Sequence, residues 1–384
     1  MLAGSLIYFT DSHLTDEASV DRRYKYRFSG SRFYSEAEDN IDEAVATANS
    51  LEVDAIVEGG DFNDLHSDNA TSNTNNNGTE GEAILQVAEA AFAAATMPRH
   101  HVPGNWDMFD YDFQNPQDWF QYVVNGTPAT VILPTETTYA TYYTDALAND
   151  ITRFYAFEFG DAIGIVLDTT GITEDGDDYQ GDSGHRNNGT HTFVALKQRA
   201  WLTAFLAANT TKPIIVFCHS WIYPFDGMFW IGYQSFDNCE AIAAILEAAP
   251  GGNVIAVFQG HHHPGTQGWW VDEVDDIIDM YLHPYYYSNP LPEIAVGTAW
   301  RITFPMIRNG IKYFCCRGQI VGWGDSAVAP TTDEGSPLGE ATPANAYYLI
   351  EVLQPVLGKW DVRVTGYGAN PVGASAEPSS YLIG

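Results

Sequence analysis

Five short segments of the chain carry side chains of the types that bind metal ions. In chain order they are Asp11-Ser12-His13, Gly60-Asp61-Phe62-Asn63-Asp64, Gly104-Asn105-Trp106-Asp107, the lone His219 and Gly260-His261-His262-His263. Carboxylate, imidazole and amide oxygen ligands together suit Mn, Fe or Zn. Any one of these segments alone could be an ordinary polar loop without a metal. Five such segments in one chain, several of them directly after an apolar run, together strongly indicate a metal site.

Short apolar runs precede several of these segments and must position them. The runs that we predict as strands are Leu6–Thr10, Ala55–Glu58, Gly164–Asp168, Pro213–Cys218 and Val254–Gln259. Each is rich in β-branched or aromatic residues. The carboxyl ends of parallel strands form one edge of a sheet, where ligands bind. We therefore expect polar residues that lie far apart in the sequence to converge at one edge.

Helical patterns alternate with these strands, which predicts an α/β fold with a substantial sheet. The apolar periodicity indicates helices near residues 41–51, 84–92, 196–206 and 241–248. Residues 340–384 are interpreted as closing strands, with candidates at 347–352 and 361–365. We interpret residues 1–384 as a single domain, with 66–82 as an Asn-rich insertion loop and 171–190 as a second polar loop.

Composition limits the possible partners. The 384 residues are 45% hydrophobic and 14% aromatic, enough to bury a core and to exclude wholesale disorder. Seventeen basic residues face 50 acidic ones, for a net charge of −33. Such a surface repels nucleic-acid backbones, so we expect no long nucleic acid as a partner. Adaptation to a salty habitat explains the charge better than an acidic binding function does.

The sequence says less about the cellular location and the oligomeric state of the protein than about its fold. No apolar run approaches the roughly 20 residues of a membrane-spanning helix, so we expect no membrane span. The first residues, MLAGSLIYFTD, show no leader pattern. An extracellular or periplasmic location is slightly favoured, with the cytoplasm of a salt-adapted organism as the alternative. The oligomeric state stays open, and four cysteines do not form a disulfide scaffold in a chain this long.

The ordered set of five segments resembles the calcineurin-like metallophosphoesterase superfamily, of the purple acid phosphatase or phosphodiesterase type. That pattern runs D-x-H, G-D-x-x-D, G-N-H-D/E, a lone His and G-H-x-H, and it spans about residues 5–265 here. The resemblance implies an α/β fold in which two mixed β sheets form a sandwich flanked by helices, in four layers α/β/β/α. It identifies no subfamily.

The resemblance also implies a dinuclear metal centre with ions of Mn, Fe or Zn. By analogy Asp11, His13 and His263 hold one ion, Asn105, His219 and His261 hold the other, and Asp61 bridges the two. The analogy gives catalytic roles to Asp61, Asn105, Trp106 and Asp107. Two ions roughly 3.5–4 Å apart clamp a phosphoryl group and supply an activated water, so no histidine or serine nucleophile is needed.

One position departs from the family pattern. Trp106 stands where the family carries a histidine that contacts the phosphate or protonates the leaving group. An indole has one N–H donor and no acid–base function near neutrality. Metal binding should survive this change, whereas proton delivery to a poor leaving group is in doubt. His100, His101 and His185 are then the residues to test as alternative acids.

Other residues near the motifs receive supporting roles. Asp64 is expected to orient a ligand or a loop from outside the first coordination sphere. Aromatic residues follow the metal-binding segments, and we predict that Trp106, Trp221 and Tyr223 wall the substrate cleft. The alternative for most of these aromatics is packing of the loops into a secondary core.

The predicted function is metal-dependent hydrolysis of a phosphoester. A small phosphodiester or nucleotide-type substrate is slightly favoured over a phosphomonoester, because of Trp106 and the aromatic residues. The alternative is a non-hydrolytic metal-binding or structural protein that retains the metal site. A protein phosphatase is disfavoured by the acidic surface.

Overall fold

Two β sheets form the centre of the protein. The computed structural model describes residues 2–14, 37–62, 90–104, 131–132, 154–171, 193–222, 236–261, 306–316, 318–319, 346–356, 359–368 and 380–381. All structural statements below concern these residues.

The first sheet has the strand order β13-β12-β11-β1-β2-β3. Its strands are β1 (Leu2–Phe9), β2 (Ala55–Glu58), β3 (Arg99–His101), β11 (Tyr347–Val356), β12 (Lys359–Tyr367) and β13 (Ser380–Tyr381). Strands β1, β2 and β3 are parallel, with Ile7 opposite Ile56 and Val57 opposite His100. Strand β11 pairs antiparallel with both β1 and β12, so the sheet is mixed.

The second sheet has the order β4-β5-β6-β7-β8-β10-β9. Its strands are β4 (Val131–Ile132), β5 (Tyr155–Phe159), β6 (Ala162–Val166), β7 (Ile214–Cys218), β8 (Val254–Gln259), β9 (Met306–Arg308) and β10 (Ile311–Cys315). Strands β6, β7, β8 and β10 are parallel, whereas β4, β5 and β9 pair antiparallel with their neighbours. Both sheets therefore present a run of parallel carboxyl ends.

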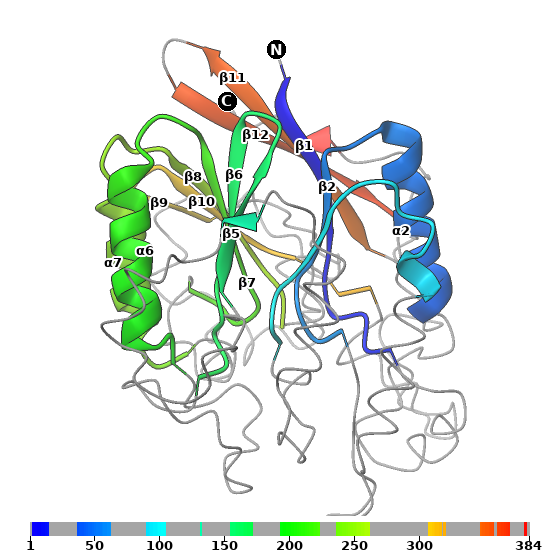
Figure 1. The fold of residues 1–384 in the computed structure, drawn as a ribbon, viewed down its shortest axis with the longest axis horizontal. Coiled ribbons are helices and arrows are strands. Elements are labelled where there is room, and N and C mark those ends of the chain that lie inside the picture. Colours follow the sequence, from blue (N-terminus) through cyan, green and yellow to red (C-terminus); the bar gives the residue numbers. More distant parts are fainter. Residues whose placement is uncertain are drawn as a thin grey trace, which may run out of the picture.

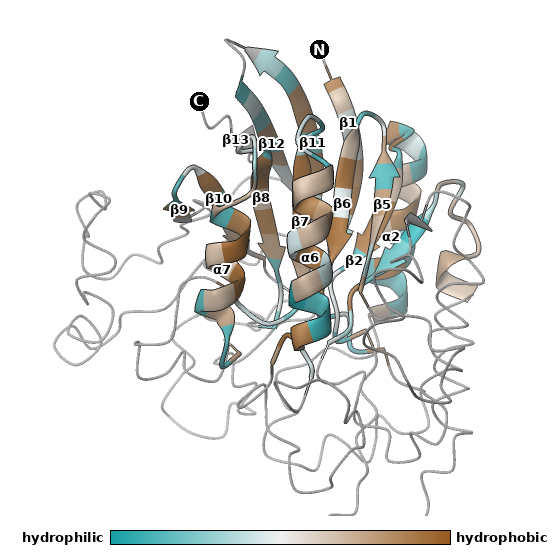
Figure 2. Ribbon diagram, turned by 60° about the vertical axis from the view of Figure 1, so that its left-hand side comes forward, coloured by the Kyte–Doolittle hydropathy of each residue, from teal (hydrophilic) through white to brown (hydrophobic). Residues whose placement is uncertain are grey.

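Helices cover the outer faces of the two sheets (Figure 1). Helix α2 (Ala37–Leu51) packs on the first sheet, and α6 (Leu196–Ala208) and α7 (Cys239–Glu247) pack on the second. The alternation along β1 shows why: Ile7 and Phe9 face the α2 side, while Leu6 points between the sheets. In Figure 2 the central strands are predominantly hydrophobic, whereas hydrophilic residues lie at the ends of strands such as β5 and β11 and on parts of the helices.

Aromatic side chains fill the space between the sheets. Tyr8 of the first sheet stacks on Phe217 of the second at a centroid distance of 5.7 Å, and Phe258 stacks on Phe314 at 4.6 Å. Full burial of one such side chain stabilises the fold by about 1.5–3 kcal/mol. This core fixes the two sheets against each other and hence the loops at their edges.

The predicted two-sheet sandwich with outer helices is confirmed. The boundaries differ at β1, which starts at Leu2 because Leu2, Gly4 and Ser5 also pair with β11. Strands β4, β5, β9, β10 and β13 were not predicted. The insertion loop at 66–82 and residues 172–190 lie outside the described residues, as does most of the helix expected at 84–92. Among the described helices, none has the length and apolar character needed to cross a membrane.

Candidate metal centre

Loops that follow β1, β2, β7 and β8 meet at one edge of the sandwich and carry the predicted metal ligands. Four of these ligands, Asp11, His13, Asp61 and His261, have left-handed backbone conformations, with φ of 55°, 45°, 54° and 68°. Residues other than glycine rarely adopt this region. Such strain clusters at functional sites, where the surrounding structure holds it in place.

Main-chain hydrogen bonds hold the loops after β1 and β2 side by side. The amides of Asp11, His13 and Leu14 donate to the carbonyl oxygens of Gly60, Asp61 and Phe62, at 2.9, 2.9 and 2.6 Å. The two loops therefore continue the pairing of their strands beyond the sheet. This backbone ladder satisfies the polar groups of the strained residues and fixes Asp11, His13 and Asp61 relative to one another.

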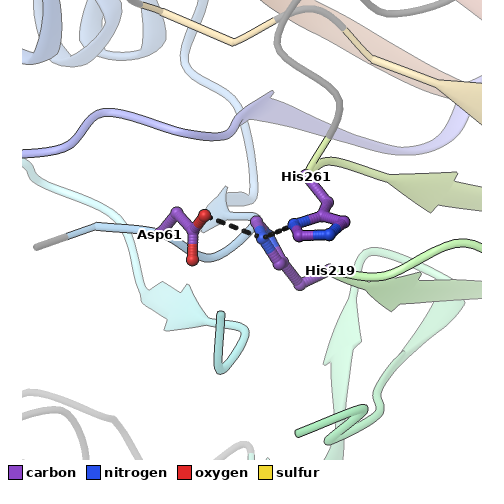
Figure 3. Close-up of side chains that lie close together, drawn as sticks. All are labelled: Asp61, His219 and His261. Atoms are coloured by element: carbon purple, nitrogen blue, oxygen red, sulfur yellow. Dashed lines mark hydrogen bonds and ion pairs between the residues drawn. The ribbon is translucent and has the colours of Figure 1, made fainter. Parts of the chain in front are cut away.

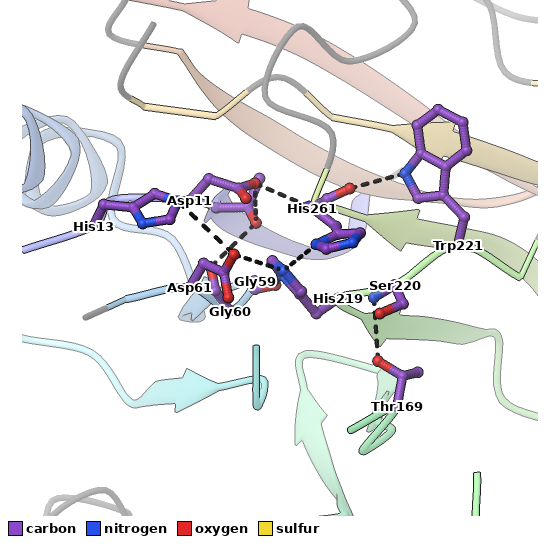
Figure 4. Close-up of polar contacts among 12 residues, drawn as sticks. Asp11, His13, Gly59, Gly60, Asp61, Thr169, His219, Ser220, Trp221 and His261 are labelled. Carbon is purple, nitrogen blue, oxygen red and sulfur yellow. Dashed lines mark hydrogen bonds and ion pairs between the residues drawn. The ribbon is translucent and has the colours of Figure 1, made fainter. Parts of the chain in front are cut away.

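The first group of candidate ligands is Asp11, His13 and Asp61. One ligand atom from each lies within 4.8 Å of the others, and all three side chains are buried. His13 Nε2 is 3.8 Å from Asp61 Oδ2. The Asp11 carboxylate accepts hydrogen bonds from the Thr10 hydroxyl (2.9 Å) and from the His261 amide (3.1 Å). Asp11 therefore connects the loop after β1 to the loop after β8, as Figure 4 shows.

The second group is Asp61, His219 and His261, whose ligand atoms also lie within 4.8 Å of one another. His219 Nε2 is 3.1 Å from Asp61 Oδ2 and 3.2 Å from His261 Nδ1 (Figure 3). The other ring nitrogen of His219, Nδ1, lies 3.0 Å from the Gly59 carbonyl oxygen, which can accept its proton. That tautomer leaves Nε2 free of hydrogen and directed at the centre of the cluster.

Glycines in the motifs allow the loops to approach one another. A Cβ on Gly104 would lie 2.0 Å from the Asp61 amide nitrogen, and one on Gly60 would lie 2.6 Å from His219 Nδ1. Both distances are far below van der Waals contact. Gly104 also brings the segment that continues into Asn105 against Asp61. The motif glycines are therefore explained by close packing at this site.

The charges of the cluster shift the pKa values of its members. Burial raises the pKa of Asp11 to about 7, and the Asp61 carboxylate adds to that rise. Burial by itself lowers the pKa of His219, but the adjacent Asp61 carboxylate outweighs it and raises the pKa to about 9. Burial also disfavours ionised Asp61, yet His219 and His13 hold the pKa of this carboxyl below its ordinary value. Without a metal, Asp61 and His219 therefore form a buried ion pair.

The donor set fits two transition-metal ions. Ligand atoms that each lie about 2.0–2.2 Å from one ion are at most about 4.4 Å apart. The separations of 3.1, 3.2 and 3.8 Å between the cluster atoms satisfy this limit. Asp61 Oδ2 is 3.1 Å from His219 Nε2 and 3.8 Å from His13 Nε2, so one carboxylate belongs to both groups and could be shared by two ions.

Several predicted site residues lie outside the described part of the chain, and their roles stay predictions. They are Asp64, Asn105, Trp106, Asp107, Tyr223 and His263. Trp221 is described: it is buried, and its indole N–H donates to the Gly260 carbonyl oxygen at 2.8 Å (Figure 4). This contact supports the backbone before His261. A role for Trp221 in a substrate wall stays a prediction.

The two histidines of β3 are buried in the sheet. His100 stacks on Phe157 of the second sheet at a centroid distance of 3.7 Å, and burial lowers its pKa to about 3. Burial, assisted by Arg99, also lowers the pKa of His101 to about 3. Both rings are therefore neutral at pH 7 and cannot serve as imidazolium acids. His185 lies outside the described residues.

Sequence reasoning missed two buried side chains that support the centre. Glu58, the last residue of β2, accepts a hydrogen bond from the Gly60 amide at 3.0 Å and lies 3.6 Å from His101 Nδ1. Gln319, which follows β10, accepts a hydrogen bond from the Ser12 hydroxyl at 2.7 Å. A buried acid at the end of an apolar strand is a signal that could have pointed to Glu58. Nothing local in the sequence points to Gln319.

Comparison with solved structures finds two phosphatases among the similar chains. A dimetal phosphatase from Danio rerio is 16% identical in sequence, with a TM-score of 0.53, and the match covers 99% of each chain. A purple acid phosphatase from yellow lupin (Lupinus luteus) seeds is 10% identical, with a TM-score of 0.44 over 98% of this chain and 53% of that one. No protein-family model matches the chain, and no curated protein sequence does so.

The match to the zebrafish protein covers 99% of this chain, and both sheets lie within that length. At this level of identity the likeness concerns the fold. The chain therefore has the calcineurin-like metallophosphoesterase fold that its five motifs predict.

Proposed function

We propose that this protein is a metal-dependent phosphoester hydrolase with a dinuclear metal centre. The observation that carries the proposal is the buried Asp61 carboxylate, which belongs to both ligand groups at once. The zebrafish protein of the same fold is described as a dimetal phosphatase, which supports the same chemistry here.

Bound metal ions would supply Lewis acidity and an activated water for attack on phosphorus. The chain's own residues prepare the place for them. Asp61 supplies the negative charge that two close cations require between them. The Gly59 carbonyl sets the tautomer of His219, and the His261 amide and Thr10 hydroxyl orient the Asp11 carboxylate. Burial excludes bulk water from the ligand atoms, which strengthens each of these interactions.

For the substrate, we propose a small phosphodiester or nucleotide-type ester ahead of a monoester. The support is indirect: Trp106 replaces the family's acid, and burial lowers the pKa of His100 and His101, the two described histidines outside the ligand groups. A substrate with a good leaving group needs no proton from the protein. The net charge of −33 disfavours long nucleic acids.

The test is a phosphoester assay of protein that has been stripped with a chelator and reloaded with Mn²⁺. Aryl phosphate diesters and monoesters of graded leaving-group pKa are compared, and His219→Ala serves as the inactive variant. Asn253→Leu is the matched control, because Asn253 is a buried amide at the amino end of β8, opposite the site. Turnover that is lost in His219→Ala and retained in Asn253→Leu supports the proposal.

Two results would redirect the proposal. Mn²⁺ binding without turnover above the His219→Ala variant would favour the non-hydrolytic metal-binding protein, for which Trp106 is the supporting feature. A rate that is independent of leaving-group pKa would show that an acid is present after all. Trp106→His should otherwise raise activity on alkyl esters, since general acid help is typically worth about 10²–10⁴-fold.

A further inference from the structure

Gln319 is a fully buried side chain in the short described stretch 318–319, just beyond β10. It is 307 residues from Ser12 in the sequence, yet it lies against the loop that follows β1. No motif of the family pattern includes it. A buried side-chain amide needs hydrogen-bond partners, so its contacts show what it holds in place.

All four polar groups of Gln319 have partners in the loop after β1 or in helix α2. Its Oε1 accepts from the Ser12 hydroxyl at 2.7 Å, and its amide N–H donates to the Thr10 carbonyl at 2.9 Å. Its Nε2 donates to the Asn40 carbonyl at 3.2 Å, and its own carbonyl accepts from Asn40 Nδ2 at 3.1 Å. Gln319 thus ties the loop to a helix of the outer layer through a fully satisfied buried network.

The loop that Gln319 holds carries two of the four strained ligand residues. Ser12 separates Asp11 and His13, which both have left-handed backbone conformations with φ of 55° and 45°. The Ser12 hydroxyl donates its hydrogen bond to Gln319 and not to a residue of the ligand cluster. A loop with two strained residues keeps one conformation only when surrounding contacts determine it. The hydrogen bond between Ser12 and Gln319 adds to the restraint that the backbone ladder with Gly60 and Asp61 supplies.

We infer that Gln319 is a positioning residue for the metal site formed by Asp11, His13 and Asp61, and that it acts through the Ser12 hydroxyl. The inference rests on the metal centre of the proposed function. We expect no such role toward the group of His219 and His261. Among the described residues, the hydrogen bonds of Gln319 reach the loop after β1 and helix α2, and none reaches the loops after β7 and β8.

The test measures Mn²⁺ affinity at each site separately by calorimetry, with no substrate present. In a His219→Ala background the site of Asp11 and His13 is measured, and in a His13→Ala background the other site is measured. Gln319→Leu should weaken Mn²⁺ binding about 10–100-fold in the first background, the size typical of an outer-shell partner. In the second background the change should stay within about 2-fold.

Two controls separate positioning from general destabilisation. Asn253→Leu removes a comparably buried amide with two hydrogen bonds to carbonyl oxygens, those of Asn209 and Lys212. It should lower the Tm of the metal-free protein by about 2–4 °C, as Gln319→Leu does, without changing Mn²⁺ affinity at either site. Ser12→Ala and Gln319→Leu should also be non-additive in Mn²⁺ affinity, because they remove the same hydrogen bond.

The outcomes distinguish this inference from the proposed function. Equal losses of affinity at both sites, or full additivity with Ser12→Ala, would overturn the positioning role. Wild-type protein that binds two Mn²⁺ ions but hydrolyses no phosphoester would refute the hydrolase and leave this test intact. Wild-type protein that binds no Mn²⁺ would overturn both. If Gln319→Leu fails to fold, Ser12→Ala alone must show the same site-selective loss.

Discussion

The two halves of the metal centre are held in different ways. Asp11, His13 and Asp61 come from the first sheet, and main-chain hydrogen bonds between their two loops fix them. His219 and His261 come from the second sheet, and side chains support their loops. The His219 ring contacts the Gly59 carbonyl, the Trp221 indole donates to the Gly260 carbonyl, and the Ser220 amide donates to the Thr169 hydroxyl at 3.1 Å.

The difference follows from the topology. Strands β1 and β2 are neighbours in one parallel sheet, so their loops leave the sheet in register and continue to pair. Strands β7 and β8 are neighbours too, but in the part of their loops that the structure describes, one main-chain hydrogen bond continues the pairing: the Gly260 amide donates to the His219 carbonyl oxygen at 3.0 Å. Main-chain hydrogen bonds therefore contribute more to the first half, where Ser12 and Gln319 add to them, and side-chain hydrogen bonds contribute more to the second. Asp61 is the residue that joins them.

The largest effect is expected from Asp61→Asn, which removes the shared negative charge. Both ligand groups contain Asp61, so Mn²⁺ stoichiometry should fall from two to near zero and hydrolysis should fall by more than the 100-fold that outer-shell changes reach. Metal analysis after gel filtration and the phosphoester assay measure the two effects. Retention of one tightly bound ion would show that the two halves are independent sites.

A smaller and selective effect is expected from His13→Ala and His219→Ala. Each histidine belongs to one group only, so each variant should lose one ion and keep the other. Calorimetric titration with Mn²⁺ of both variants gives the stoichiometry directly. Loss of both ions in His219→Ala, with one ion kept in His13→Ala, would mean that the second half must form before the first.

Much of the fold was predictable because the apolar runs have strong local signals. The predicted runs Ala55–Glu58 and Val254–Gln259 coincide with β2 and β8, and β7 begins one residue after Pro213, which has no N–H to donate. The start of β1 was missed because Gly4 and Ser5 have little strand preference of their own. Their pairing with β11, more than 340 residues away, decides their conformation.

The candidate site was predictable in its residue types but not in its support. The motifs gave Asp11, His13, Asp61, His219 and His261, which the structure brings together. Left-handed backbone at Asp11 or His261 has no sequence signature, since local preference disfavours it. Gln319 could not be predicted for another reason: a single glutamine between Gly318 and Ile320 carries no sequence signal, and only the long-range contact with Ser12 shows its role.

Gly60→Ala tests whether the close approach of Gly60 to the His219 ring affects metal binding, in addition to the backbone strain that the substitution causes. Gly60 has φ of +98°, and an added Cβ would lie 2.6 Å from the His219 ring. Gly310→Ala is the matched control, because Gly310 has φ of +83° with nothing within 4 Å of an added Cβ. Both should lose about 1 kcal/mol of folding free energy from the strained conformation.

Only Gly60→Ala should also displace His219, and we expect Mn²⁺ affinity at the second group to fall about 10-fold. Chemical denaturation and calorimetry measure the two quantities on the same preparations. Equal Mn²⁺ affinity in the two variants would show that His219 can shift without cost, and that the halves are less tightly packed than the distances indicate.

The smallest effect concerns the proton that His219 shares with Asp61 in the metal-free protein. The pKa of His219 is raised to about 9 in the folded protein, against about 6.5 in an unfolded chain, so the folded state binds more protons between these values. Stability from this group is fully present below pH 6.5 and is lost as the pH rises to 9. The raised pKa of Asp11 acts in the same direction, chiefly below pH 7.

The Tm of the metal-free protein should therefore fall by a few degrees between pH 6.5 and 9, and His219→Gln should flatten that slope. Calorimetric scans at constant ionic strength measure both proteins. With Mn²⁺ bound, the Tm should instead rise with pH over this range, because a ligand histidine must be neutral and metal affinity therefore rises with pH. A metal-free Tm that rises over this range, or an unchanged slope in His219→Gln, would show that Asp61 and His219 do not form the pair that joins the two halves.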